Sequence, residues 1–217
     1  SNTYMPLSVM QCYISQALSV PGVRGIVLAT RPDCLSTSWL DYLEHLSRQT
    51  FVMVELGIES VNDDVLRQIG RGHDVATSAQ AVRQLHLRGI HVGVHFILGL
   101  PGESRESQLQ QAFEASRWKV DSVKLHQLQI LRGSRFARQY AEFPERFSLF
   151  SLPDYVSLVA DFIERLHPAI AVERFVSQSP ASLLIAPRWG VKPDEVVRLV
   201  CSTLAERRTQ QGILCPL

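Results

Sequence analysis

The sequence has few cysteines, and none of them is spaced like a metal site. Cys12, Cys34, Cys201 and Cys215 are scattered over 217 residues, without a C-x-x-C pair, a zinc pattern or a cluster-binding run. We interpret them as reduced thiols. The sequence also lacks a run of about 18 apolar residues, which predicts no transmembrane helix. Its first residues lack the basic and apolar regions of a signal peptide, so we expect a cytoplasmic location and no membrane partner.

Lysine is scarce as well, because Lys119, Lys124 and Lys192 are the only three among 22 basic residues. The net charge of +1 argues against a global nucleic-acid-binding field, although it leaves room for a local basic surface. Arginine suits bidentate contacts to carboxylates or phosphates, but codon bias explains the same excess. With 46% hydrophobic and 20% charged residues, the composition is that of a globular domain with a sizeable core.

No glycine-rich dinucleotide fingerprint follows any expected strand, which weighs against a Rossmann fold. Strands and helices alternate, which predicts an α/β fold with a parallel sheet. We expect a TIM-like barrel or part of one, with a flat doubly wound sheet as the alternative. The expected strands are 25–30, 51–58, 91–98, 122–131 and 171–176; the expected helices are 6–19, 39–46, one between 74 and 89, 104–118, 152–166 and 193–208. Between residues 132 and 151 we expect a looser segment.

Polar residues gather where these strands end. Alternation places Glu55, Gly57 and Glu59 on one face of their strand. The strand 91–98 runs into a Gly-Pro-Gly turn, whose glycines let backbone approach a ligand closely. Arg71 comes twelve residues after Glu59, just before the next expected helix, and an arginine there could hold a carboxylate at the mouth of a pocket. Since α/β folds keep their ligand sites at the carboxyl ends of strands, we predict a pocket for a polar, nucleoside-sized ligand.

Three strings carry a family resemblance: E-L-G-I-E-S at 55–60, R-G-H at 71–73 and H-F-I-L-G-L-P-G-E at 95–103. They resemble the radical SAM superfamily, and more narrowly its YhcC-type group, which is related to the elongator-type and oxygen-independent coproporphyrinogen oxidase branches. The resemblance implies a partial (βα)6 barrel. We expect its core at residues 1–140 and a C-terminal extension at 141–217. Such proteins bind S-adenosylmethionine (SAM) beside a 4Fe-4S cluster, which cleaves the sulfonium to a 5′-deoxyadenosyl radical that abstracts hydrogen from substrate.

Matched residue by residue, the resemblance places six side chains or glycines at SAM: Glu59, Arg71, His95, Ile97, Gly99 and Gly102. Glu59 takes the position that contacts the ribose hydroxyls, and Arg71 the position that pairs with the methionine carboxylate. Ile97 takes the position that packs on adenine, while Gly99 and Gly102 belong to the G-x-I-x-G-x-x-G signature. His95 replaces the first glycine of that signature; it is expected either to hydrogen-bond the ligand or to be a satisfied core histidine. No catalytic residue is assigned.

The sequence departs from the family at the cluster. The family holds its 4Fe-4S cluster with three cysteines in a C-x3-C-x2-C or similar run, and no such run is present. We therefore expect no metal ligands in this chain, a start inside the domain, and no activity of this part alone. One barrel edge would then be open, and its exposed backbone and apolar surface favour a homodimer.

The resemblance also implies partners. For the full-length protein it implies an electron donor such as flavodoxin or ferredoxin, and a link to wobble-uridine modification in tRNA. Arg132, Arg135 and Arg138 recur every three residues, as on a solvated face or a phosphate-contacting edge. The competing hypothesis is a cluster-less module that binds a nucleoside, RNA or a partner protein without redox chemistry.

Overall fold

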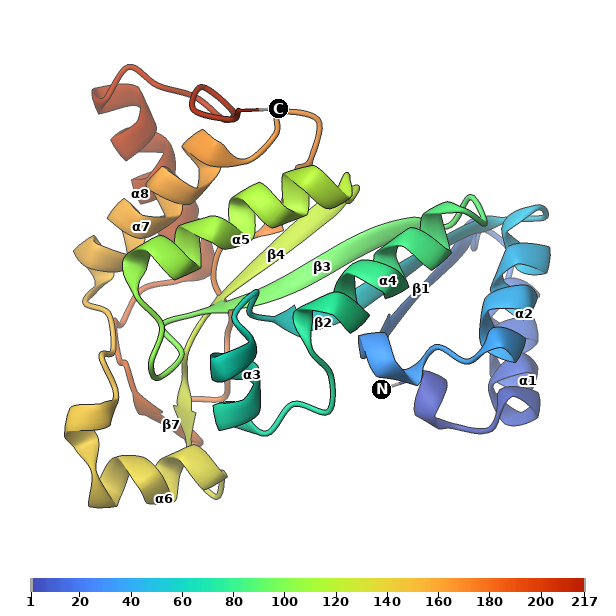
Figure 1. Ribbon diagram of the computed structural model, residues 1–217, viewed down its shortest axis with the longest axis horizontal. Coiled ribbons are helices and arrows are strands. Elements are labelled where there is room, and N and C mark those ends of the chain that lie inside the picture. The colour runs from blue at the N-terminus through green and yellow to red at the C-terminus, as the bar shows by residue number, and fades with distance from the viewer. Residues whose placement is uncertain (1, 217) are drawn as a thin grey trace.

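A computed structural model describes residues 2–216 of the chain. Its centre is a five-stranded, fully parallel sheet in the order β1-β2-β3-β4-β6. Figure 1 shows this sheet curving through the molecule, which makes it part of a barrel wall. The strands are β1 (Gly25–Thr30), β2 (Phe51–Glu59), β3 (His91–Leu98), β4 (Ser122–Gln127) and β6 (Ala171–Arg174). The predicted α/β fold with a partial barrel is confirmed.

Four of the expected helices begin where short polar side chains cap them, while those that begin at Leu7 and Pro193 have no side-chain cap. Ser36, Asp74, Ser104 and Ser151 each accept a hydrogen bond from a backbone amide in the first turn of the helix that follows. The expected helices are thereby confirmed, with ends shifted by one or a few residues. The helices are α1 (Leu7–Leu18), α2 (Thr37–Ser47), α3 (Asp63–Ile69), α4 (Val75–His86), α5 (Arg105–Trp118), α6 (Arg135–Glu142), α7 (Leu152–Arg165) and α8 (Pro193–Glu206).

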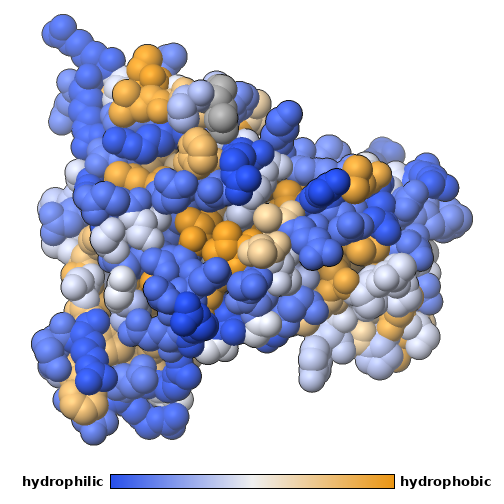
Figure 2. Space-filling view, in the orientation of Figure 1, coloured by the Kyte–Doolittle hydropathy of each residue, from blue (hydrophilic) through white to orange (hydrophobic). Residues whose placement is uncertain are grey.

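The hydrophobic core lies between the sheet and its helices, and Figure 1 shows α4 and α5 lying across the same face of the sheet. Alternate residues of β3, from Val92 to Leu98, are fully buried there, and Phe96 packs against Phe162 of α7. The helix-covered surface is largely hydrophilic, with apolar residues visible mainly between the helices (Figure 2). Burial of this one face leaves the other sheet face for polar residues.

The structure corrects the expected strand at 122–131. It divides into β4 and a separate β5 (Ile130–Leu131), which pairs antiparallel with β7 (Leu184–Ala186). The side chain of Gln129 bonds to the segment after β6, with its Nε2 at 3.4 Å from the Ser177 carbonyl oxygen. The chain therefore leaves the main sheet before residue 130. An apolar run alone does not indicate which partner strand each of its parts will choose.

Two helices and one strand were not expected from the sequence. Helix α3 has seven residues and is too short to show a clear periodicity, whereas the eight residues of α6 are amphipathic, a signal that sequence reasoning missed. Helix α6 lies in the segment expected to be looser. Strand β7 was missed because its three residues are too few to show an alternation. The division after residue 140 stays a prediction; β6, which lies beyond it, pairs with β4 in the main sheet. Among residues 2–216, no helix is long and apolar enough to cross a membrane.

Candidate functional site

Two charged residues meet above Gly57, near the carboxyl end of β2. Glu59 ends that strand, and Arg71 follows α3; their side chains approach to 3.3 Å between Glu59 Oε1 and Arg71 Nη2. The same Arg71 nitrogen donates to the Gly57 carbonyl oxygen at 2.5 Å. A Cβ at position 57 would lie 2.8 Å from Glu59 Oε1 and 3.3 Å from Arg71 Nη2. Gly57 therefore leaves the space that this pair occupies.

His73 positions the guanidinium of Arg71. The Arg71 Nε donates to His73 Nε2 at 3.4 Å, and the other ring nitrogen of His73 lies 3.3 Å from the Ser78 hydroxyl at the start of α4. His73 is buried, and burial together with the nearby charge of Arg71 lowers its pKa. The imidazole is therefore neutral at neutral pH and can accept from Arg71. These contacts give His73 a structural role.

The Glu59–Arg71 pair lines a cavity of about 320 Å³. Ile97, at the end of β3, lines the same cavity, so the structure brings together three of the six predicted residues. The other walls come mainly from segments that sequence reasoning missed: Ile69 on α3, and Ser134, Arg135 and Phe136 at the start of α6. The complete lining is Glu59, Ile69, Arg71, Ile97, Leu100, Gln129, Leu131, Ser134, Arg135 and Phe136.

Local signals could have found both missed helices. Asn62 caps α3 by accepting from the amides of Asp64 and Val65, and Gly70 ends the helix in the left-handed conformation. Ser134 caps α6 in the same way. For α3, a cap followed by acidic residues and then a glycine marks a helix even when it is too short for a hydrophobic repeat. For α6, the signal is the cap together with its amphipathic pattern.

Burial makes Glu59 unusual. It raises the pKa of the Glu59 carboxyl, and the charge of Arg71 opposes this rise only in part. Glu59 also adopts φ of 73°, in the left-handed region that non-glycine residues rarely occupy. A strained, buried carboxylate beside an arginine is typical of a ligand site rather than of a structural ion pair.

The remaining predicted residues lie outside this cavity. Gly99 and Gly102 line a neighbouring cavity of about 480 Å³, together with Glu103, Arg146 and Phe150. Both glycines have positive φ, at 89° and 83°. A Cβ on Gly99 would lie 2.9 Å from the Phe150 ring. Ligand contact by these glycines, as by all six residues, stays a prediction.

Gly99→Ala is expected to destabilise the fold more than Gly133→Ala. Gly133 also has a positive φ, but nothing lies within 4 Å of the position of its Cβ. The control should therefore cost about 1–2 kcal/mol for the left-handed backbone alone. Gly99→Ala must in addition displace Phe150. Urea unfolding of both variants measures the difference, and equal losses would show that the Phe150 contact contributes nothing.

His95 belongs to a polar cluster on the sheet face opposite α4 and α5, where Glu55 is buried. Its Nε2 lies 3.1 Å from Glu55 Oε2, and Lys124 contacts the other oxygen of the same carboxylate. Lys124 also reaches Glu173 at 3.4 Å. The rings of His95 and His126 are 5.5 Å apart. The cluster gives one nitrogen of His95 a hydrogen-bond partner. In the pairing of β2 with β3, His95 lies opposite Gly57, so the cluster adjoins the Glu59–Arg71 pair.

His126 is expected to remain neutral well below the usual range of histidine. Burial, with the charges of His95 and Arg174, lowers its pKa to about 4. Between about pH 6.5 and 4 the unfolded chain binds a proton that the folded His126 does not, so this residue lowers stability as pH falls through that window. Imidazole NMR should report the low pKa directly. An ordinary value near 6.5 would contradict this geometry, and His126→Asn should remove its part of the slope.

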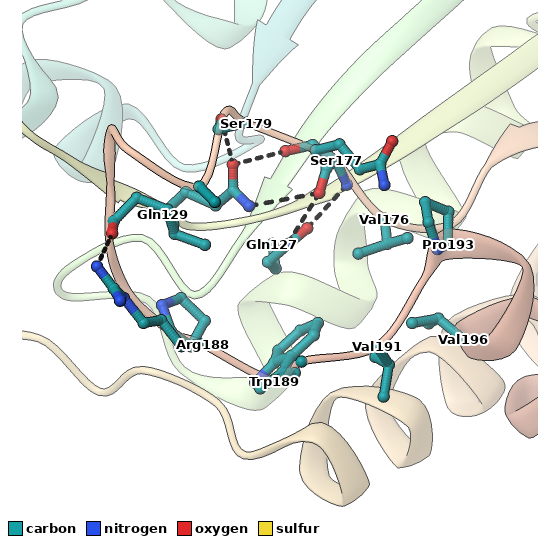
Figure 3. A pocket seen from close by; sticks show the side chains of 15 residues that line it. Gln127, Gln129, Val176, Ser177, Ser179, Arg188, Trp189, Val191, Pro193 and Val196 are labelled. Carbon is teal, nitrogen blue, oxygen red and sulfur yellow. Dashed lines mark hydrogen bonds between the residues drawn. The ribbon is translucent and has the colours of Figure 1, made fainter.

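A further cavity of about 310 Å³ adjoins the first, because Gln129 lines both. Figure 3 shows Gln127 and Gln129 hydrogen-bonded to Ser177 and Ser179 on one side of it, with Trp189 and Val191 on the other side. The Ser177 amide donates to Gln127 Oε1 at 2.8 Å, and the Ser179 hydroxyl donates to Gln129 Oε1 at 2.7 Å. These contacts fix Gln129 as the wall between the two cavities.

The side chains from residue 2 to 216 offer no group of three or more histidine, cysteine or acidic residues that could hold a metal ion. The four cysteines are free and separate. The residues described therefore do not fit a 4Fe-4S cluster. They do fit SAM at the level of donor chemistry, because a carboxylate, a guanidinium and apolar walls share one cavity.

Comparison with known proteins decides the family. The family model for the radical SAM superfamily matches residues 9–110, and that for the Radical SAM C-terminal domain matches residues 120–206. The chain belongs to the radical SAM superfamily. This radical SAM chain is 34% identical to YtqA of Bacillus subtilis over 98% of its length, and 32% identical to YhcC of Escherichia coli over 87%. It spans 65% and 61% of those two relatives.

More distant relatives extend the same branch. The radical SAM chain is 27% identical, over 75% of its length, to the tRNA uridine(34) acetyltransferase of Dehalococcoides mccartyi, of which it covers 35%. Its fold matches that of Elp3 from Methanocaldococcus infernus with a TM-score of 0.75, over 86% of this chain and 43% of that one, at 20% identity. The predicted YhcC-type, elongator-like branch is confirmed.

Proposed function

We propose that this chain holds SAM in the cavity between Glu59, Arg71 and Ile97. The observation that carries the proposal is the convergence of Glu59 and Arg71, from two separate segments, in a cavity with apolar walls. The carboxylate oxygens of Glu59 would accept from the ribose hydroxyls, and Arg71 would pair with the methionine carboxylate. Ile97 offers an apolar surface to the adenine ring. Gly99 and Gly102 would support this site from the turn that follows β3, and His95 from the adjoining polar face.

Calorimetry of SAM against the chain tests this proposal. Saturable binding is expected, with S-adenosylhomocysteine as a comparison ligand that lacks the sulfonium methyl group. Because the nucleoside and carboxylate contacts lie within this chain, an absence of any measurable binding would contradict the assignment of the cavity.

For the whole protein we propose radical SAM chemistry. A 4Fe-4S cluster would supply the electron that cleaves the sulfonium of SAM, and its ligands would come from outside the residues described. This chain alone is then inactive, and the whole protein would need a donor such as flavodoxin or ferredoxin in the cytoplasm. Electron paramagnetic resonance of the whole protein, reconstituted anaerobically and then reduced with dithionite, tests for the cluster, because only the reduced cluster is paramagnetic. A silent spectrum would favour the alternative of a cluster-less binding module, which the missing ligand set among residues 2–216 supports.

We further propose tRNA as the substrate, in wobble-uridine modification. The support is the name of the Dehalococcoides relative, a tRNA uridine(34) acetyltransferase. Arg135 lines the cavity, although its guanidinium also donates to the Gln68 carbonyl oxygen at 3.2 Å. Comparing the modified nucleosides of tRNA from a deletion strain and from wild type tests this substrate. Identical nucleoside profiles would contradict it.

A further inference from the structure

Glu103 is a half-buried acid that the proposed SAM cavity does not include. It follows the Gly-Pro-Gly turn and lies just before α5. Its Oε1 accepts from the Ser60 hydroxyl at 2.5 Å and from Gln111 Nε2 at 3.0 Å. Its other oxygen, Oε2, is buried without a partner, as is Oε1 of Gln111. Such orphaned oxygens are costly, so this arrangement needs an explanation beyond packing.

The partner of Glu103 connects it to the site. Ser60 directly follows Glu59, and it is fully buried. Its hydroxyl oxygen also accepts from the amide of Asn62 at 3.1 Å. Asn62 in turn caps α3, the helix that leads to Arg71. One hydrogen-bonded chain therefore runs from α5 through Glu103 and Ser60 to both segments that carry the charged pair.

A second contact joins the turn before α5 to α3. A Cβ on Gly102 would lie 2.9 Å from Oε1 of Gln68, which is on α3. The turn at 99–103 thus packs closely on the helix that precedes Arg71. The register of β2 against β3 also shifts between Gly57 and Glu59, where the chain turns into its left-handed residue. Ser60 directly follows Glu59 in the chain, and its hydroxyl is fixed from two sides by Glu103 and the Asn62 amide.

We propose that Glu103 is a positioning residue for SAM binding: through Ser60 it holds Glu59 in the left-handed conformation that places its carboxylate beside Arg71. This inference rests on the proposed function of the cavity. Glu103 itself need not touch the ligand. Its effect on Glu59 would pass through the hydroxyl group of Ser60. Removing either the Ser60 hydroxyl or the Glu103 carboxylate therefore tests the proposal.

The charge state of Glu103 supports this role. Burial raises its pKa to about 7, against the opposing hydrogen bonds from Ser60 and Gln111. The charged groups nearby are Glu59 beyond Ser60, Arg105 and Arg146, which line the adjoining cavity, and the exposed Glu106 on α5. Arg105 is held by Asp161. The ionised carboxylate accepts from Ser60 more strongly than the neutral acid does, because charge-assisted hydrogen bonds are the stronger ones.

A double-mutant cycle on the 217-residue chain tests the route. Ser60→Ala and Glu103→Ala are each expected to raise the Kd for SAM about tenfold, and the double variant is expected to be no weaker than the worse single variant. Purely structural effects of two separate losses would instead multiply to about a hundredfold. Glu106→Gln, an exposed acid on the same helix, is the matched control and should leave the Kd unchanged.

The conservative variant Glu103→Gln separates position from charge. Its amide oxygen still accepts from Ser60, so at pH 6 the Kd should stay within about threefold of wild type. Between pH 6 and 8 the wild-type affinity should rise about fivefold relative to Glu103→Gln, because only the wild type ionises at this position. The α-amino group of SAM titrates in the same range and cancels in this comparison.

The outcomes distinguish this inference from the proposed function. If wild type fails to bind SAM, or if Glu59→Ala binds as well as wild type, the cavity assignment itself is wrong. If wild type binds and Glu59→Ala does not, multiplicative losses in the cycle, or an unchanged Kd in both single variants, overturn the role of Glu103. Unfolding free energies, measured for every variant, show whether a lost affinity reflects loss of fold.

Discussion

Glu59→Ala is expected to weaken SAM binding roughly ten- to hundredfold. A hydrogen bond to a charged group contributes about 1.5–3 kcal/mol, and each 1.4 kcal/mol is a factor of about ten in Kd. The change should leave the fold intact, because burial raises the pKa of Glu59 and its ionised form gains little from its surroundings. Calorimetry measures the Kd, and Arg71→Ala should weaken binding to a similar extent through the methionine carboxylate.

The matched control is Glu206→Ala, which removes an exposed acid at the end of α8. It should leave the Kd unchanged. Wild-type affinity in both Glu59→Ala and Arg71→Ala would remove the pocket assignment. Loss in Arg71→Ala alone would equally contradict the assignment, because the assignment places Glu59 at the ligand, whereas loss in Glu59→Ala alone would contradict only the role of Arg71.

Lys124→Met should lower the free energy of unfolding by about 3–5 kcal/mol at neutral pH. The side chain of Lys124 lies between the carboxylates of Glu55 and Glu173, and breaking a buried pair leaves its partner charge uncompensated. In the folded wild type, burial raises the pKa of Glu55, but the hydrogen bond and charge of Lys124 outweigh it and the pKa lies below its usual value. Urea unfolding as a function of pH measures the effect.

The sign of the pH dependence identifies the cause. Because the folded pKa of Glu55 is lowered in the wild type, its stabilising contribution is present above the unfolded pKa and is lost as pH falls through the folded one. In Lys124→Met that pKa should rise, so the deficit should shrink as Glu55 takes up a proton in acid. Lys192→Met, at an exposed position, is the control. A deficit that does not depend on pH would point to lost packing instead of lost charge.

Much of the sheet could be predicted because its strands are long apolar runs bounded by turn residues. Alternation along β2 also placed Gly57 and Glu59 on one face. Arg71 could be predicted as a site residue because it follows Glu59 by twelve positions, just before the next helix. What the sequence could not show was which segments complete the cavity. Phe136 and Ser134 belong to a short helix, and their place beside Ile97 depends on β5 leaving the main sheet.

The polar face shows the same limit. Alternation put His95 on the same side of its strand as Gly93, and nothing in the sequence indicated that Glu55 and Lys124 would surround it. His95 lies 40 positions from Glu55 in the chain, and Lys124 lies 69 positions from it. Only the parallel register of the strands brings the three together. Likewise, nothing in the sequence indicated the contact between Glu103 and Ser60, which spans 43 positions.

The position of Gln129 between two cavities would couple the binding of one ligand to the binding of another. It is a wall of the cavity beside Glu59 and of the cavity beside Trp189, and Ser179 holds its amide oxygen. A ligand in one cavity that moves the Gln129 side chain changes the shape of the other cavity. By thermodynamic reciprocity, each ligand would then alter the affinity for the other by the same factor. A single glutamine could thus make the arrival of one small molecule report on the presence of a second.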